Sequence, residues 1–403
     1  MTMAADKQDK VLNVPTLRFP EFTGNWEKTK LADITKRVLR KNKGVVSERP
    51  LTISAQYGLI DQRDFFNKVV ASENLEGYYL LKKGEFAYNK SYSNEYPWGA
   101  VKRLDSYDEG ALSTLYICFE CIGVDGDWLV HYFDSPKWNG QVSAIAVEGA
   151  RNHGLLNVGI EDFFGTQHFV PNNKKEQKKI ATFLNLIDER ISTQIRIIEE
   201  LKLYRNTLVF RLLTPKDKWL RLSIGDVAHV IGGGTPDTNI EDYWNGNIQW
   251  YTPSEIGKKK YVTESERTLT QKGLDNSSAK LLPPNTILLS TRATIGECSI
   301  AKQECCTNQG FQSLIANKVT PEFLYYLIQT KKKDLLSKAS GSTFAEISAN
   351  EVRKIHICIP STQEEQKAIV QPLSAYDEKI ETECKILHLY ELQKQFLLGQ
   401  MFI

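Results

Sequence analysis

Apolar residues recur at alternating steps of four and three along residues 171–213. This spacing keeps the apolar side chains on one stripe of an α-helix and predicts a coiled-coil seam. The residues expected to form the seam are Ile180, Leu184, Ile187, Ile191, Ile198, Leu201 and Leu208. The pattern therefore predicts a long helix that pairs with another helix.

The partner helix is predicted at residues 360–403, because the same pattern returns there at a constant offset of 189 residues. Its expected seam residues are Ile369, Leu373, Tyr376, Ile380, Leu387, Tyr390 and Leu397. A repeat of this length indicates two copies of one structural unit. We expect the two helices to form an antiparallel coiled coil.

Two seam positions are polar in both copies, since Gln194 corresponds to Glu383 and Arg205 to Lys394. A register in which facing residue numbers add to 588 would pair Arg205 with Glu383 and Gln194 with Lys394. Such polar pairs can fix a coiled-coil register. Charge favours the pairing, because the first copy has nine basic and five acidic residues and the second has four and seven.

Each helix has a predicted start and a predicted interruption. The capping signals place a glutamate three residues after the N-cap: Asn173 with Glu176, and Thr362 with Glu365. Pro372 removes a helical hydrogen bond and is expected to kink or restart the second helix. Ser374, and Asn185 at the matching position of the first copy, are then available as new N-caps.

Before each helix lies a block of short apolar runs separated by turn-forming residues, which predicts a mixed α+β domain. The expected organisation is a disordered N-terminus at 1–14, domains at 15–170 and 216–359, and helical regions at 171–215 and 360–403. The openings of the blocks correspond, WEKTKLADI at residue 26 and WLRLSIGDV at residue 219. We expect one scaffold with different surface residues.

Composition limits the function classes. A chain of 403 residues fits two domains with connectors, and a net charge of +2 means that any nucleic-acid contact must come from local patches or partners. Seven cysteines without a secretory or membrane-spanning segment suggest reduced thiols and a cytoplasmic location. Cys118 and Cys121 form a lone CxxC, for which buried strand cysteines are favoured over a metal site.

Catalytic motifs are not found. The sequence Gly232-Gly233-Gly234-Thr235-Pro236 lacks the Lys and Ser/Thr of a phosphate-binding loop and is interpreted as a flexible turn. No methyl-donor loop, metal-ligand spacing or histidine triad is present. We therefore expect a non-catalytic chain that binds no metal and no cofactor of its own.

The polar residues of both blocks suit DNA contact, because Arg and Lys bind phosphates or guanine edges and Asn and Gln pair with adenine. Taken one at a time, each is an ordinary type of surface residue. The candidates in the first block are Lys82, Lys83, Asn89, Lys90, Lys102, Arg103, Arg151, Asn152 and His153. Those in the second are Thr235, Thr252, Ser254, Lys258, Thr291, Arg292, Asn308, Gln309 and Ser342.

The chain resembles the specificity subunits of type I restriction-modification systems. The resemblance is carried by LRFPEFTGNWEKTKLADI, by EQKKIATFLNLIDERI and EQKAIVQPLSAYDEKI in the repeats, and by GGGTPDTNIEDYWNGNIQWYTPSEI. It implies two target recognition domains that each read one half of an asymmetric double-stranded DNA site. The helices would set the spacing between the halves.

The resemblance also implies the partners. Two methyltransferase subunits would dock on the helices and bring S-adenosylmethionine for DNA methylation, and motor-nuclease restriction subunits would bring ATP and Mg. The alternative from another class is a coiled-coil scaffold with two protein-binding domains and no DNA role. Sequence-specific, salt-sensitive binding to duplex DNA would separate the two hypotheses.

Overall fold

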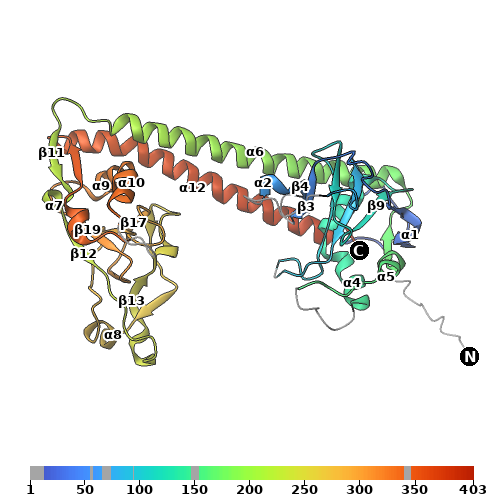
Figure 1. Ribbon diagram of the computed structural model, residues 1–403, viewed down its shortest axis with the longest axis horizontal. Coiled ribbons are helices and arrows are strands. Elements are labelled where there is room, and N and C mark those ends of the chain that lie inside the picture. The colour runs from blue at the N-terminus through green and yellow to red at the C-terminus, as the bar shows by residue number, and fades with distance from the viewer. Residues whose placement is uncertain (1–12, 55–57, 66–73, 94, 147–153, 340–345) are drawn as a thin grey trace, which may run out of the picture. The chain divides into compact units, whose positions relative to one another are not determined.

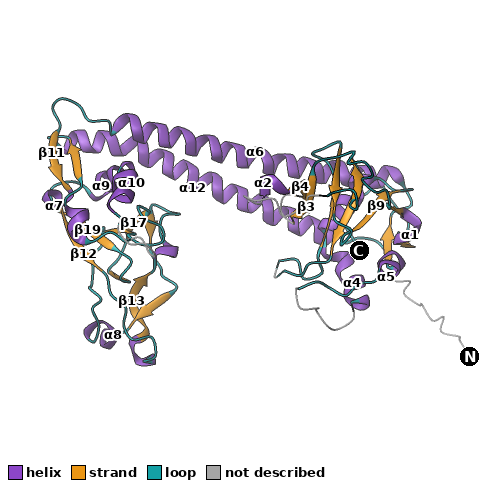
Figure 2. Ribbon diagram, in the orientation of Figure 1, coloured by secondary structure: helices purple, strands orange, loops and turns teal. Residues whose placement is uncertain are grey.

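A computed structural model describes residues 13–54, 58–65, 74–93, 95–146, 154–339 and 346–403. Residues 1–12, most of the predicted disordered N-terminus, lie outside this set. The chain divides into two compact units (Figure 1), the first made of residues 1–194 and 386–403 and the second of residues 195–385. Both units mix helices and strands (Figure 2), which confirms the predicted α+β class.

The first unit contains two four-stranded sheets. One is antiparallel, in the order β2 (Thr35–Arg37), β9 (Ile117–Cys121), β6 (Phe86–Asn89) and β7 (Ala100–Arg103). The other has the order β4 (Gly58–Asp61), β3 (Pro50–Ser54), β8 (Glu109–Leu112) and β5 (Tyr79–Lys82), with β3 and β8 parallel. A ribbon of β1 (Glu27–Lys30) and β10 (Gln167–Val170) precedes the first long helix.

The helices of the first unit are short except for the long pair. They are α1 (Leu31–Ile34), α2 (Gln62–Phe65), α3 (Gly126–Asp134), a 3-10 turn (Pro136–Trp138), α4 (Asn139–Ile145) and α5 (Ile160–Gly165). Helix α3 begins at a cap in which Asp125 accepts a hydrogen bond from the Trp128 backbone N–H. Its buried face presents Trp128, Leu129 and Tyr132 to the core.

The second unit repeats this plan. Its main sheet has the order β12 (Ala228–Gly232), β19 (Gln312–Ala316), β16 (Ile287–Leu289), β17 (Cys298–Ala301) and β14 (Tyr261–Val262). A smaller sheet has the order β15 (Arg267–Leu269), β13 (Trp244–Tyr251) and β18 (Cys305–Thr307). A ribbon of β11 (Leu220–Ser223) and β20 (His356–Ile359) leads to the second long helix.

The remaining elements of the second unit are also short. They are α7 (Ile224–Val227), α8 (Gln271–Asp275), α9 (Pro321–Thr330), α10 (Lys332–Lys338), α11 (Ala349–Arg353) and two 3-10 turns (Glu241–Tyr243 and Pro253–Glu255). Helix α9 presents Phe323, Leu324 and Tyr326 to the core of this unit. It therefore occupies the place that α3 has in the first unit.

The two units share one strand topology. The order β2-β9-β6-β7 is matched by β12-β19-β16-β17, and the pairs β3-β4 and β3-β8 by β13-β15 and β13-β18. In both small sheets the first of these pairs is antiparallel and the second is parallel. This agrees with the sequence prediction of one scaffold with different surface residues.

The long helices are α6 (Lys174–Leu212) and α12 (Gln363–Gln400). Helix α12 continues through Pro372, so the predicted restart at this proline is wrong. Ile369 and Leu373, on either side of the proline, are 3% and 0% exposed in the core of the second unit. Burial of these side chains holds the segment helical and outweighs the lost hydrogen bond.

Much of the predicted seam packs into the domain cores. In the first unit Ile180, Leu184 and Ile187 share one buried cluster with Trp26 and Leu397. In the second unit Ile369 and Leu373 share a cluster with the core of that unit. Ile198 is also buried, and the other seam positions are partly buried: Ile191, Leu201, Leu208, Tyr376, Ile380, Leu387 and Tyr390.

The register predicted for the seam is wrong. Arg205 Nε lies 2.9 Å from Asp377 Oδ1, and Lys394 Nζ lies 2.7 Å from Asp188 Oδ1, so facing numbers add to 582 instead of 588. Glu383, the partner predicted for Arg205, is instead ion-paired with Lys379 on its own helix. Packing of the helix ends into the two cores sets the register, and the polar seam positions adapt to it.

Candidate nucleic-acid interface

Several candidate residues of the second unit gather where two loops run side by side. The backbone N–H of Thr291 donates to Gly310 O at 2.8 Å, which joins the loop after β16 to the turn after β18. Asn308 Oδ1 accepts from the Gly310 N–H at 2.8 Å and stiffens that turn. Thr294 Oγ1 donates to Pro253 O at 3.5 Å, which brings the 3-10 turn bearing Ser254 alongside.

The glycines of the GGG sequence allow the backbone to approach this turn closely. A Cβ added at Gly233 would lie 2.0 Å from the Asn308 carbonyl oxygen, and one at Gly234 would lie 2.2 Å from Ser278 Oγ. Neither position has room for a side chain, so both glycines are needed for this close packing. Close packing places the next residue, Thr235, so that its hydroxyl donates to Gln309 Oε1.

These contacts form a cluster that we call the loop face, composed of Thr235, Ser254, Arg292, Thr294, Asn308, Gln309 and Glu346. Gln309, Ser254 and Thr294 are exposed, and Arg292 and Glu346 are half-buried and joined by an ion pair of 2.7 Å. The structure thus brings five of the nine predicted residues of this domain together. Asn and Gln amides beside an arginine offer the donors and acceptors that base edges require.

Other predicted residues of the second domain lie elsewhere or are not available. Thr291 is 0% exposed, and its hydroxyl donates to Gly310 O at 3.2 Å, so it supports the loop and does not contact solvent. Thr252 caps the turn that carries Ser254 by donating to Glu255. Lys258 is exposed. Ser342 lies outside the described residues.

The candidates of the first domain are more dispersed, and two are already paired. Lys102 Nζ donates to Asp134 at 2.8 Å, and Arg103 forms ion pairs of 2.7 Å with both Asp105 and Asp127. Because Lys102 and Arg103 are paired with carboxylates, they link segments of the domain and have little net charge available to bind DNA phosphates. Sequence reasoning did not foresee Asp127 and Asp134 as partners, because they come from another segment, α3.

The remaining candidates of the first domain occupy both ends of β6. Lys82 and Lys83 are exposed at the turn before this strand, and Asn89 and Lys90 are half-buried at its far end. Lys90 Nζ donates to Val158 O at 3.4 Å. Arg151, Asn152 and His153 lie outside the described residues. The strand β6 is equivalent to β16, so Lys90 stands at the place of the loop face.

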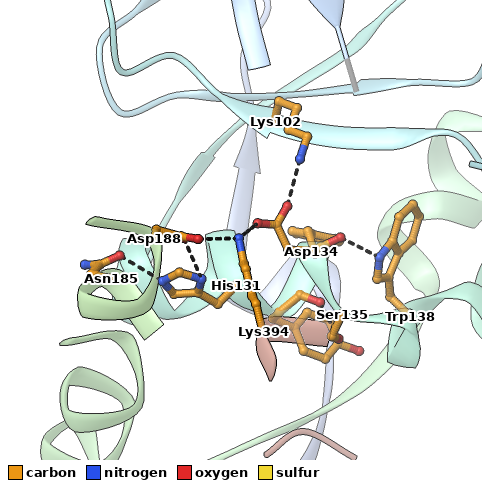
Figure 3. Close-up of polar contacts among 10 residues, drawn as sticks. Lys102, His131, Asp134, Ser135, Trp138, Asn185, Asp188 and Lys394 are labelled. Atoms are coloured by element: carbon orange, nitrogen blue, oxygen red, sulfur yellow. Dashed lines mark hydrogen bonds and ion pairs between the residues drawn. The ribbon is translucent and has the colours of Figure 1, made fainter. Parts of the chain in front are cut away.

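Lys394 of α12 lies between two carboxylates in the first unit (Figure 3). Its Nζ is 2.7 Å from Asp188 Oδ1 on α6 and 3.4 Å from Asp134 Oδ2 on α3, and Lys102 donates to the other oxygen of Asp134. Burial opposes the charge of Lys394, but attraction by Asp134 and Asp188 outweighs it and raises the pKa of the ammonium group. Lys394 is therefore a charged residue that links α12 to α6 and α3 by ion pairs.

His131 of α3 completes this cluster, which we call the first anchor. Its Nε2 lies 2.8 Å from Asn185 Oδ1, an oxygen that only accepts, so Nε2 carries the proton of the neutral ring. Burial lowers the pKa of His131. Asn185 therefore binds α3 instead of starting a new helix, contrary to its predicted role as an N-cap (Figure 3).

The second unit contains an equivalent cluster, the second anchor. Arg205 pairs with Asp377 at 2.9 Å and donates to Gln329 Oε1 of α9 at 2.6 Å. Tyr326 OH donates to the other oxygen of Asp377 at 2.6 Å. Ser374, the predicted N-cap, accepts from Lys260 Nζ at 2.8 Å. The anchors use the same repeat positions: Asp188 and Asp377 are identical, whereas the other side chains differ.

A tryptophan and a glutamate mark the start of each long helix. Trp26 Nε1 donates to Glu176 Oε1 at 3.2 Å, and Trp219 Nε1 donates to Glu365 Oε1 at 3.0 Å. Arg18 adds a hydrogen-bonded ion pair of 2.6 Å to Glu176. Glu176 and Glu365, which were expected to complete capping boxes, therefore accept hydrogen bonds from the tryptophan near the start of each domain. The tryptophan and the glutamate both recur in the two copies of the repeat. This recurrence was the sequence signal from which the contact between them could have been predicted.

Two further observations concern metal-ligating residues and a cysteine. Within the described part of the chain, no three or more His, Cys, Asp or Glu side chains are grouped to hold a metal ion. Cys118 is buried in β9, and burial raises the pKa of its thiol to about 12. Among the described residues, no helix has the length and apolar character needed to cross a membrane.

Comparison with known proteins gives a consistent result. A family model for the type I restriction modification DNA specificity domain matches residues 216–389. A specificity subunit of a type I restriction enzyme of Methanocaldococcus jannaschii is 40% identical over 176 residues, which are 42% of this chain and 40% of that protein. One of Escherichia coli is 26% identical over 222 residues, 51% of this chain and 54% of that protein. The chain thus spans about half the length of these relatives.

Solved structures share the fold. A structure described as showing complex assembly and conformational transition of the type I R-M system has a TM-score of 0.60 and 16% identity, covering 93% of this chain and 96% of that one. The S subunit of a type I system from M. genitalium has a TM-score of 0.56 and 16% identity, covering 97% and 99%. The fold therefore extends over both units and both long helices.

Proposed function

We propose that this chain is a specificity subunit of a type I restriction-modification system, which reads double-stranded DNA at two separate half-sites and performs no chemistry itself. The observation that carries the proposal is one strand topology used twice with different loop residues. At the equivalent ends of β6 and β16 stand Lys90 and Arg292. A scaffold that is the same in both domains but carries different residues in its loops is suited to reading two unrelated DNA sequences.

The helices would set the number of base pairs between the half-sites. Each domain is tied to the helix pair by an anchor and by a tryptophan–glutamate contact within its own unit. A domain held in this way is mounted in a fixed orientation. Inserting one heptad into both helices should lengthen the gap without changing the bases read, and an unchanged gap would contradict this role.

Partner subunits would supply the catalysis. Helix α12 exposes Leu389, Leu392 and Phe396 by 62%, 52% and 63%, and steps of three and four place them on one face. Helix α6 exposes Leu203 and Phe210 by 65% and 73%. Leu392 and Leu203 are equivalent in the repeat. Two such surfaces suit two methyltransferase subunits.

In this assembly the methyltransferase subunits would bind S-adenosylmethionine, and the restriction subunits would bind ATP and Mg. The chain acts as the reader and the docking platform, with duplex DNA as its ligand. We place this activity in the cytoplasm. Purified alone, the chain should release no product from DNA with S-adenosylmethionine or with Mg²⁺, and any product would contradict the reader role.

The decisive experiment maps methylated adenines in cells that express the chain with its methyltransferase. We expect one bipartite, asymmetric motif. Replacing residues 15–170 by the corresponding block of a relative should change one half only, because the second scaffold is untouched. Absence of a sequence motif would support a scaffold without a DNA role, and a change in both halves would contradict separate reading.

Docking is tested by charge placed on the exposed apolar faces. Leu392→Glu and Leu203→Glu should each remove one of the two methyltransferase copies from the complex, since each surface serves one copy. Size-exclusion chromatography with light scattering measures the mass of the assembly. Leu220→Glu, another exposed apolar residue outside the long helices, is the matched control. Full assembly of both helix variants would refute docking at these faces.

A further inference from the structure

The loop face of the second unit contains an acid–base pair with no evident structural duty. Arg292 Nη2 and Glu346 Oε2 are 2.7 Å apart, and their side chains are 39% and 38% exposed. Exposed ion pairs contribute little to folding stability. Both groups therefore remain available to a ligand that can satisfy a cation and an anion at once.

We propose that Arg292 and Glu346 together read one G·C base pair in the major groove, with Glu346 as a specificity-determining residue. This inference rests on the proposed function, because it names what one half-site must contain. Arg292 donates to guanine O6 and N7, and Glu346 accepts from the N4 amino group of the paired cytosine. An arginine for guanine and a carboxylate for cytosine match the hydrogen-bonding pattern of these edges.

The backbone holds both residues in place. Ser290 Oγ donates to Arg292 O at 2.8 Å, and the Ile347 N–H donates to Thr291 O at 3.2 Å, which sets Glu346 beside Arg292. Ala293, the next residue, has a φ of 50°. A residue other than glycine keeps this left-handed conformation only where its surroundings enforce it. The tip of the loop is therefore presented in one fixed conformation.

The carboxylate decides which DNA the arginine accepts. A free arginine binds any phosphate, because that contact carries no sequence information. Glu346 repels phosphates and stays paired with the Arg292 guanidinium. The ion pair is exchanged only for a base pair that offers acceptors to Arg292 and an amino group to Glu346. It therefore suppresses binding to DNA that offers only its backbone. Gln309 and Thr235, beside the pair, can read the next base.

The test compares the wild-type complex with Arg292→Gln and Glu346→Gln. The full chain, with its methyltransferase, is titrated with duplexes that change each base pair of the mapped site in turn, and with a duplex lacking the site. A good base contact discriminates by roughly 5-fold to 150-fold. Arg292→Gln should lose this discrimination at one G·C position of one half-site and keep it elsewhere.

Glu346→Gln should lose discrimination at the same position and also bind site-free DNA several-fold more tightly. The freed arginine would gain about one phosphate contact, so the slope of log affinity against log salt should steepen by about 0.9. Asp242→Asn, which breaks an exposed ion pair with Lys272 in the same unit, should leave all these values unchanged.

The outcomes are separable. If the wild-type complex prefers no duplex, the proposed function fails. If the wild type is specific but both variants retain every preference, or weaken all duplexes equally, Arg292 and Glu346 contact no base and the inference is overturned. Melting temperatures equal to that of the wild type show that the variants are folded, as expected for exposed side chains.

Discussion

Replacing Lys394 by Met removes the cation from the first anchor and leaves two carboxylates behind. Breaking a buried ion pair from one side costs about 3–5 kcal/mol. Two features reduce this value. Asp134 keeps its bond of 2.8 Å to Lys102, and Asp188 is 39% exposed and can be rehydrated. We therefore expect the free energy of unfolding of the first unit to fall by about 2–3 kcal/mol.

Hydrogen exchange measured by mass spectrometry resolves this loss, because peptides from α3 and from residues 386–400 report on the first unit. Lys394→Arg should retain most of the stability, since Arg205 fills the equivalent position of the second anchor. Lys385→Met, which breaks an exposed pair with Glu381, is the control. The reasoning is refuted if Lys394→Met costs no more than Lys385→Met, or if the additional change Asp188→Leu recovers nothing.

Two other predictions concern pH and packing. Burial lowers the pKa of His168 to about 4, so between pH 7 and 4 the unfolded chain takes up a proton that the folded chain refuses. The free energy of unfolding of the first unit, measured in urea, should fall by up to about 3 kcal/mol over this range, and His168→Gln should flatten its dependence on pH. Gly233→Ala drives a Cβ into Asn308 O and should abolish site-specific DNA binding in titrations, whereas Gly232→Ala, whose nearest neighbour is 3.6 Å away, should not. Equal binding by both glycine variants would contradict the close packing.

The repeat was enough to predict the long helices and their pairing, because apolar periodicity is a local property of the chain. The same repeat also contained Asp188 and Asp377, identical residues at matched positions, which became the partners of Lys394 and Arg205. Sequence reasoning paired the cations with the seam positions Gln194 and Glu383 instead. It treated the helices as an isolated coiled coil, whereas the domain cores determine how the helices meet.

The predicted DNA-binding residues show the same limit. Residue type selected Arg292, Asn308 and Gln309, which the structure brings together, but it also selected Thr291, which is fully buried. It missed Glu346, because a carboxylate is not an expected DNA ligand until it is seen beside an arginine. Exposure and ion pairing depend on segments that are distant in sequence.

The sequence by itself determined the duplicated plan of this protein: two mixed domains, two paired helices and a resemblance to the type I specificity subunits. Periodicity, turn residues and a repeat of 189 residues are sufficient for that. The tertiary structure alone decided the helix register, the continuity of α12 through Pro372 and the gathering of the loop face. These features arise where burial in a core and contacts between distant segments outweigh local preference.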